Sequence, residues 1–271
     1  MSIPQIVLAA TWNPRGEIDR LERLLDRLYS AYSTLFISLP PQPDDPASQG
    51  DLLDRLAGEA LVCHVNPDWS GGRYMALKLA VQHHARYIHY VDLDRLLRWV
   101  EQRPDEWLQT VHRIPSWDYL VLGRTPEAYA THPQALVQTE ALSNAVISYL
   151  IGQFMDVSAG SKGFSFQAAG YVIEHTRPGN ALGTDGEWTV LLQRAGFKLG
   201  YLEVNGLDWE SADRYQSQAA DPRRQRQAAE IYDADPNHWA RRTAVAEEII
   251  RMGLQTAQRE ILAIKPTPVE S

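Results

Sequence analysis

The sequence predicts an α/β protein with a mostly parallel sheet covered by helices on both faces. Two observations support this: apolar runs typical of buried strands alternate with segments whose apolar residues recur at helical spacing, and the second half adds further helices. Strands buried on both faces are expected to be continuously apolar, as these are. The 271 residues, 44% of them hydrophobic, suffice for one large domain with a small appendage.

The first half supplies most of the sheet. We expect strands at residues 5–10, 34–39, 60–65, 87–91 and 119–122. The most regular helix is expected at residues 17–32, where Leu21, Leu24 and Leu28 recur at helical spacing. Further helices are expected near residues 51–59, 73–85 and 104–112. Loops containing Gly, Pro, Asn or Asp are expected at residues 11–16, 40–50 and 66–72.

The second half is less regular. We expect helices near residues 134–153 and from about residue 167, with a loop of small residues at 158–163 between them. A helix at 185–195 is indicated by Trp188, Leu191 and Leu192 on one face and by Gly196 as its C-terminal stop. A strand at 197–204 follows.

The chain is predicted to divide at residue 220. Residues 1–220 would form the α/β domain, and residues 221–271 a charged, amphipathic helical extension packed on it. We expect this extension to cover the ligand site or to form a homodimer surface.

Charge and hydropathy exclude several partners. The formal net charge is −8, whereas nucleic acids and anionic membranes require clustered Lys and Arg. No apolar stretch approaches the length of a membrane span, and Met1 to Ala10 has no basic residue ahead of its apolar run. We therefore expect no nucleic-acid partner, no membrane span and a cytoplasmic location. Cys63 is the only cysteine, which excludes an intrachain disulfide.

Two carboxylates, Asp92 and Asp94, follow the expected strand 87–91. Ligands of parallel α/β sheets bind beyond the carboxyl ends of the strands. Two oxygen ligands there suit Mg²⁺ or Mn²⁺, which could bridge to a diphosphate. The alternative is that Asp92 caps a helix and Asp94 lies in its first turn. A second pair, Asp233 and Asp235, lacks a preceding strand and is interpreted as a solvated turn.

The loop before the helix at 73–85 has features of a phosphate-binding segment. Gly71 and Gly72 would let backbone N–H groups approach a phosphate, and Arg73 could add a charge-assisted hydrogen bond. The alternative is an ordinary glycine turn with an arginine on the surface.

A third segment places two acids, Asp185 and Glu187, at the start of the expected helix 185–195. They follow a loop with Gly183 and Thr184, where they could meet a substrate hydroxyl. Asp185 would be the general base of an inverting reaction. The alternative is helix capping by Thr184 or Asp185.

Together these segments resemble the GT-A glycosyltransferases of the family 2 type, and the sequence is also similar to their mannosylglycerate synthase branch. The resemblance covers about residues 5–210 and rests on Thr11-Trp12-Asn13, Ser70-Gly71-Gly72-Arg73 with Ala76-Leu77, Tyr90-Val91-Asp92-Leu93-Asp94, and Asp185 with Leu191, Gly196 and Tyr201. It implies a GT-A fold. It also implies transfer of a sugar from a nucleoside-diphosphate-sugar to a hydroxyl of a small or glycan acceptor.

The resemblance also implies residue roles. Asp92 would contact the ribose and lie near the cation, Asp94 would be the direct metal ligand, and Asp185 would lie near the acceptor and the reacting sugar. Glu187 remains a catalytic candidate only through its place at the start of the same helix. The late metal ligand of the family is often His, and here Asp208 or Glu210 would have to replace it. The predicted ligand-binding residues are Thr11, Asn13, Asp68, Gly72, Arg73, Asp92 and Lys162.

Lys162 has two interpretations. In the loop 158–163 it could meet an anionic group of the acceptor, or it could be an exposed lysine in a flexible loop.

Other functions fit the sequence less well. Phosphatases that use a D-x-D motif need it after the first strand, whereas this motif lies mid-chain and precedes Arg95. Sugar-1-phosphate nucleotidyltransferases begin with a Gly- and Arg-rich phosphate loop that residues 9–16 do not provide. A non-enzymatic alternative is a degenerate GT-A domain that binds a sugar nucleotide or a protein partner without turnover.

Overall fold

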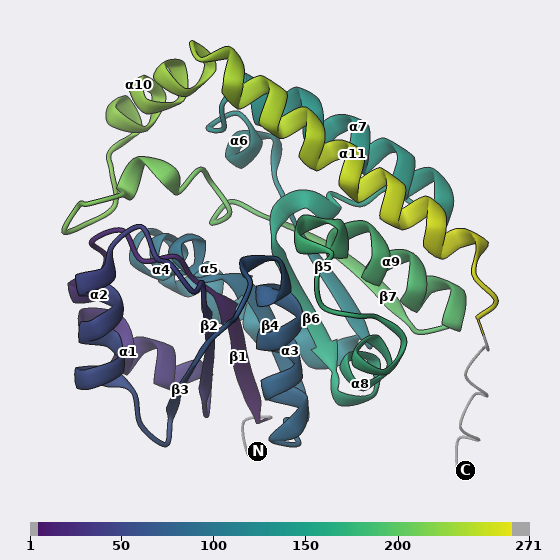
Figure 1. Ribbon diagram of the computed structural model, residues 1–271, viewed down its shortest axis with the longest axis horizontal. Coiled ribbons are helices and arrows are strands. Elements are labelled where there is room, and N and C mark those ends of the chain that lie inside the picture. The colour runs from purple at the N-terminus through teal and green to yellow at the C-terminus, as the bar shows by residue number, and fades with distance from the viewer. Residues whose placement is uncertain (1–4, 262–271) are drawn as a thin grey trace.

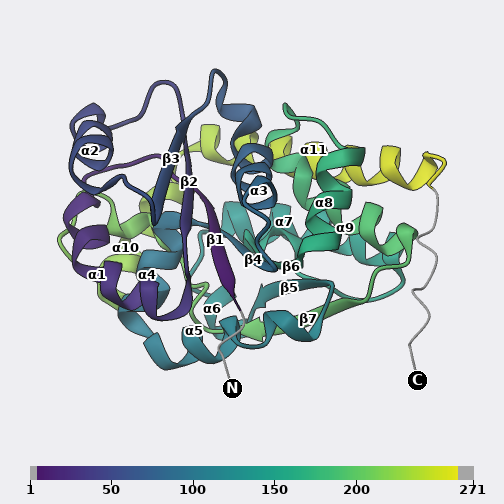
Figure 2. The ribbon, with the colours of Figure 1, turned by 90° about the horizontal axis from the view of Figure 1, so that it is seen from below.

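The computed structural model describes residues 5–261 and shows one seven-stranded sheet with helices on both faces (Figure 1, Figure 2). The strand order is β3-β2-β1-β4-β6-β5-β7. The strands are β1 (Ile6–Thr11), β2 (Leu35–Leu39), β3 (Leu61–Val65), β4 (Tyr87–Asp92), β5 (Tyr119–Arg124), β6 (Ser161–Ser165) and β7 (Leu199–Val204). The predicted α/β class with a mostly parallel sheet is confirmed.

One strand was not predicted. β6 pairs antiparallel with β4 and with β5, whereas the pairs β1–β2, β1–β4, β2–β3 and β5–β7 are parallel. The prediction of a loop at 158–163 is therefore wrong for residues 161–163. The strand consists largely of small residues, so its hydropathy does not distinguish it from a loop. The sheet requires glycine at position 163, because a Cβ there would lie 2.8 Å from Ile114.

The helices agree with most of the predicted segments. They are α1 (Ile18–Ala31), α2 (Pro46–Asp51), α3 (Gly72–Gln82), α4 (Leu93–Gln102), α5 (Pro104–Val111), α6 (Pro126–Tyr129), α7 (Gln134–Ile151), α8 (Phe166–His175), α9 (Thr184–Ala195), α10 (Pro222–Asp233) and α11 (Pro236–Gln258). The helix expected at 51–59 is instead α2 followed by a π-helical turn, Leu52–Leu56, and residues 57–59 are not helical. It begins earlier because Asp45 caps α2 by accepting hydrogen bonds from Ala47 N and Ser48 N.

Helix α4 begins directly after Asp92, as the capping alternative required. Asp92 nevertheless makes no side-chain cap hydrogen bond, so its carboxylate is free for other contacts. Asp94 lies in the first turn of the helix.

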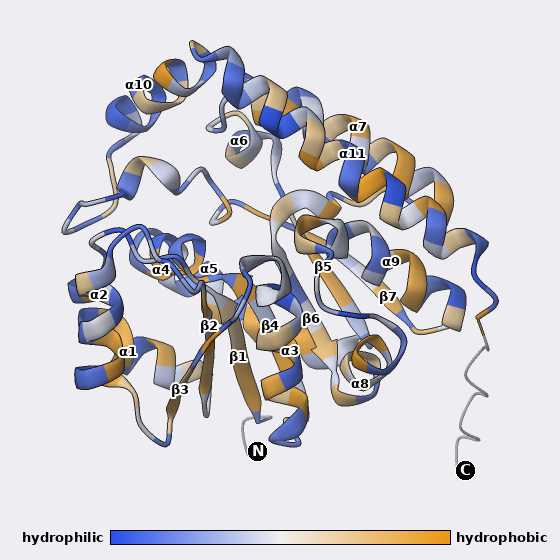
Figure 3. Ribbon diagram, in the orientation of Figure 1, coloured by the Kyte–Doolittle hydropathy of each residue, from blue (hydrophilic) through white to orange (hydrophobic). Residues whose placement is uncertain are grey.

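Two apolar layers enclose the sheet. Alternate residues of β1 point to opposite faces: Leu8 packs with residues of α1 and α4, and Ala9 with residues of α3 and α8. In Figure 3 the surface helix α1 carries both hydrophobic and hydrophilic colours, as expected of a helix that buries one face. The layers hold the carboxyl ends of β1, β2 and β4 at one edge of the sheet.

The C-terminal helices pack back onto the domain. Helix α11 runs beside α7 and also contacts α9 (Figure 1). Asp233, at the end of α10, accepts hydrogen bonds from Gln134 N and Ala135 N at the start of α7, and Asp235 caps α11. The second acidic pair is therefore structural. Within residues 5–261, no helix is long and apolar enough to span a bilayer.

Candidate active site

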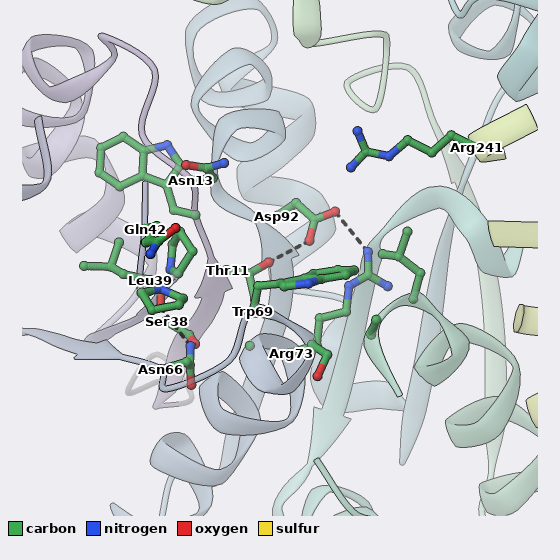
Figure 4. Close-up of a pocket in the computed structure, with 17 residues that line it drawn as sticks. Thr11, Asn13, Ser38, Leu39, Gln42, Asn66, Trp69, Arg73, Asp92 and Arg241 are labelled. Carbon is green, nitrogen blue, oxygen red and sulfur yellow. Dashed lines mark hydrogen bonds and ion pairs between the residues drawn. The ribbon is translucent and has the colours of Figure 1, made fainter. Parts of the chain in front are cut away.

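Two adjoining cavities lie at the carboxyl ends of β1, β2 and β4. The first cavity, of about 490 Å³, is bordered by residues that follow β1, β2 and β3 and by the start of α3 (Figure 4). The second cavity, of about 460 Å³, extends from Asp94 and Asp185 to α10 and α11. Six residues border both: Asn13, Trp69, Arg73, Asp92, Leu182 and Arg241.

Asp92 lies at the junction and is oriented by three neighbours. Its Oδ1 accepts hydrogen bonds from Thr11 Oγ1 and Tyr90 OH, each at 2.9 Å, and its Oδ2 pairs with Arg73 Nη2 at 3.2 Å. Burial opposes ionisation, but the charges of Arg73 and Arg95 outweigh it and lower the pKa of Asp92 below its usual value. The site therefore holds a fixed carboxylate at the end of β4.

Arg73 continues this contact into a buried chain of charges. Its Nη1 lies 2.8 Å from Asp185 Oδ2, and Asp185 Oδ1 accepts a hydrogen bond from Lys162 Nζ. Lys162 is 0% exposed and also donates to Val157 O. The alternative of an exposed loop lysine is therefore wrong. Lys162 borders neither cavity, so the structure places it behind Asp185.

The ion pairs determine the charge state of Asp185. Its burial favours the neutral acid, but Arg73 and then Lys162 lower its pKa below the usual value. A carboxylate stabilised in this way takes up a proton weakly.

The charges of two neighbouring acids act on Asp94. Desolvation, and then the charges of Glu210 and Asp92, raise the pKa of Asp94 to about 7, whereas Glu210 is held ionised by an ion pair with Arg95 at 3.2 Å. A bound cation would relieve this repulsion. Among residues 5–261 no three metal-ligating side chains are already gathered into a coordination site. Mg²⁺ commonly takes one or two carboxylates and completes its shell with phosphate and water, so Asp94 and Glu210 beside Asp92 fit such an ion.

The two candidates for the late ligand are placed differently. Glu210 borders the second cavity together with Asp94. Asp208 borders neither cavity and accepts hydrogen bonds from Arg98 Nε and Nη2 at 2.9 and 2.8 Å. The structure thus brings Glu210, and not Asp208, to the acidic cluster.

The remaining predicted residues fall into two groups. Thr11, Asn13 and Gly72 border the first cavity, where a Cβ on Gly72 would come within 3.4 Å of Thr11 Cγ2. Asp68 and Glu187 border neither cavity. Asp68 caps the short helical turn Trp69–Gly71. Glu187 is buried, accepts a hydrogen bond from Asn180 Nδ2 at 2.7 Å and pairs with Arg259 at 3.0 Å.

Sequence reasoning missed two polar residues of the first cavity. Ser38 lies in β2, and Asn66 follows β3 and donates hydrogen bonds to Ser38 Oγ and Leu39 O. The buried Asn66 Oδ1 has no hydrogen-bond partner among the described residues. The signal that singled out Asp92, a polar side chain at the carboxyl end of a strand, also applies to both.

The C-terminal extension covers the second cavity. The residues it contributes are Tyr232, His238, Arg241, Arg242, Val245, Glu248 and Ile249. Of the two alternatives for the extension, the covering of the site is therefore what the fold provides.

No protein-family model matches this chain, and no curated protein matches its sequence.

Proposed function

We propose that this chain is a metal-dependent glycosyltransferase of the GT-A type that transfers a sugar from a nucleoside-diphosphate-sugar to a hydroxyl of a small or glycan acceptor. The observation that carries the proposal is the acidic cluster of Asp92, Asp94 and Glu210, which borders the second cavity and through Asp92 also reaches the first. Sites at the carboxyl ends of parallel strands are where α/β proteins bind nucleotides.

The first cavity suits the nucleoside. It combines apolar walls such as Leu39 and Pro40 with the amides of Asn13 and Asn66, a mixture that fits a base and a ribose. Trp69, which is 63% exposed, offers a ring for stacking. The sugar and the acceptor would then occupy the second cavity.

Mg²⁺ or Mn²⁺, held by Asp94 with Glu210 and near Asp92, would neutralise charge on the diphosphate as the nucleotide departs. Residues of the protein would orient the groups around the diphosphate. Thr11 and Tyr90 orient Asp92, and Asp92 with Asp185 orients Arg73 beside both cavities.

Asp185 fits a positioning role better than that of a general base. Two cations already compete for its proton site, so it would hold Arg73 and the acceptor side of the cavity in place rather than remove a proton. The pairing of Asp185 with two cations also supports the second candidate function, a degenerate domain that binds a sugar nucleotide without turnover, because such a domain needs no general base.

The test measures nucleotide binding and turnover together. UDP-, GDP- and dTDP-sugars are screened by thermal shift with and without Mn²⁺, and donor hydrolysis is then assayed with the best ligand. We expect one donor to raise the melting temperature only when Mn²⁺ is present, and Asp94→Ala to lose that increase.

Asp26→Ala is the matched control, because Asp26 is an exposed acid of α1 far along the chain from the cluster. Unchanged Mn²⁺-dependent binding in Asp94→Ala would exclude Asp94 as the ligand. Binding without any hydrolysis or transfer would favour the degenerate domain.

A further inference from the structure

The arginines that border the second cavity differ in how their charge is used. Four of them pair with carboxylates: Arg15 with Asp44 and Asp94, Arg73 with Asp92 and Asp185, Arg95 with Glu210, and Arg242 with Glu140. Arg214 and Arg241 make no ion pair with any residue that the structure describes. An incoming polyanion is attracted most strongly by positive charge that is not already neutralised.

Of these two arginines, only Arg241 borders both cavities. In Figure 4 its side chain extends from α11 toward the junction at which Asp92 and Arg73 meet. A nucleotide whose nucleoside fills the first cavity would place its phosphates at this junction.

Helix α11 is anchored to the domain by residues that follow this arginine. The adjacent Arg242 pairs with Glu140 on α7, and Ile249 is buried against the domain. The helix therefore holds Arg241 over the junction without using its guanidinium group for packing.

We propose that Arg241 binds the diphosphate of the donor, so that the C-terminal helices complete the nucleotide site. This inference rests on the proposed function. Arg73 is held in place by two carboxylates and forms one wall of the junction. Arg241 supplies the opposing cation, and its guanidinium group can donate two parallel hydrogen bonds to phosphate oxygens.

The experiment compares Arg241→Ala and Arg241→Lys with the wild type by calorimetry. The titrants are the nucleoside diphosphate selected from UDP, GDP and dTDP, and the corresponding nucleoside, with MnCl₂ at constant ionic strength. Arg251→Ala is the control, because Arg251 lies on the same helix, pairs only with Glu247 among the described acids, and borders neither cavity.

We expect Arg241→Ala to bind the diphosphate about tenfold more weakly or worse, and to bind the nucleoside as the wild type does. Arg241→Lys should lie between the two, since it keeps the charge and loses the paired donors. Arg251→Ala should match the wild type.

Equal diphosphate affinity in Arg241→Ala and Arg251→Ala would overturn the role of Arg241 and leave the proposed function intact. Equal losses of diphosphate and nucleoside binding would also overturn it, because the effect would then not be specific to the phosphates. If the wild type binds no nucleoside diphosphate with Mn²⁺, the proposed function fails first and this inference fails with it. Melting curves show that each variant is folded.

Discussion

Opposite charges of neighbouring side chains neutralise one another in the site. Asp92, Arg73, Asp185 and Lys162 alternate in sign along one chain, and all of them except Asp92 are buried. An ion removed from such a chain leaves its partner buried without compensation, which costs more than the intact pair contributes. The chain therefore fixes Arg73 beside the cavities, and its own stability depends on all four members.

Variants of Asp185 and Lys162 test this chain. Asp185→Asn should lower the free energy of unfolding by about 3 kcal/mol, because it leaves the Lys162 ammonium group 0% exposed without its counterion. Lys162→Met should lower the free energy of unfolding by less, because Asp185 still has its ion pair with Arg73. The double variant should cost less than the sum of the two, as measured by urea unfolding.

Asp185→Asn should also retain nucleotide binding, because Asp92 still holds Arg73, and should lose transfer. Strictly additive effects of the two substitutions would show that the ion pair between positions 162 and 185 does not form.

At the scale of elements, the site depends on how closely β6 approaches the end of β4. Gly160, just before β6, has a φ of +73°, and a Cβ there would lie 2.8 Å from Asp92 Oδ2. Glycine is thus required twice, once for the left-handed backbone and once for the space beside the carboxylate. The backbone at Gly160, between the helical turn Val157–Ala159 and β6, therefore limits where the Asp92 carboxylate can lie.

Gly160→Ala and Gly152→Ala separate these two requirements. Gly152 has a φ of +74° but nothing within 4 Å of the position of a Cβ. Both variants should lose about 1 kcal/mol of stability from backbone strain. Only Gly160→Ala should also weaken Mn²⁺-dependent nucleotide binding, because its methyl group displaces Asp92. Calorimetry on both proteins checks this, and equal affinities would refute it.

At the scale of the whole molecule, the C-terminal extension is packed into the domain. Gly186 of α9 allows α11 to approach so closely that a Cβ on it would lie 2.3 Å from the backbone oxygen of Ile249. Glu187 adds an ion pair with Arg259, which directly follows α11. We expect the extension and the sheet to unfold as one unit, because their apolar residues form one continuous layer.

Gly186→Ala tests this coupling, with Gly170→Ala as its control. Gly170 lies in α8 with nothing within 4 Å, so alanine there should stabilise the protein by up to about 1 kcal/mol through helix propensity. At Gly186 the clash should outweigh that gain and destabilise by about 1–3 kcal/mol. Hydrogen exchange should show faster exchange in α11 and in β4 alike. Faster exchange confined to α11 would indicate that the extension unfolds independently.

Local sequence patterns were enough to predict the alternation of strands and helices and the placement of Asp92 and Asp94 near a strand end. Both follow from local patterns, because a strand buried on two faces must be apolar along its length and a polar residue must mark where it emerges. Asp94 beside Asp92 and Arg73 near the helix start were therefore predictable, as was Gly72.

The other features depend on contacts that form in the folded protein. The fold makes residues 161–165 a strand, buries Lys162, brings Glu210 rather than Asp208 next to Asp94, and brings Arg241 to the border of both cavities, far along the chain from Asp92 and Arg73. Each of these outcomes depends on contacts between segments far apart in the sequence. A short run of small residues, or one arginine on a helix, carries no local pattern that specifies its distant partner.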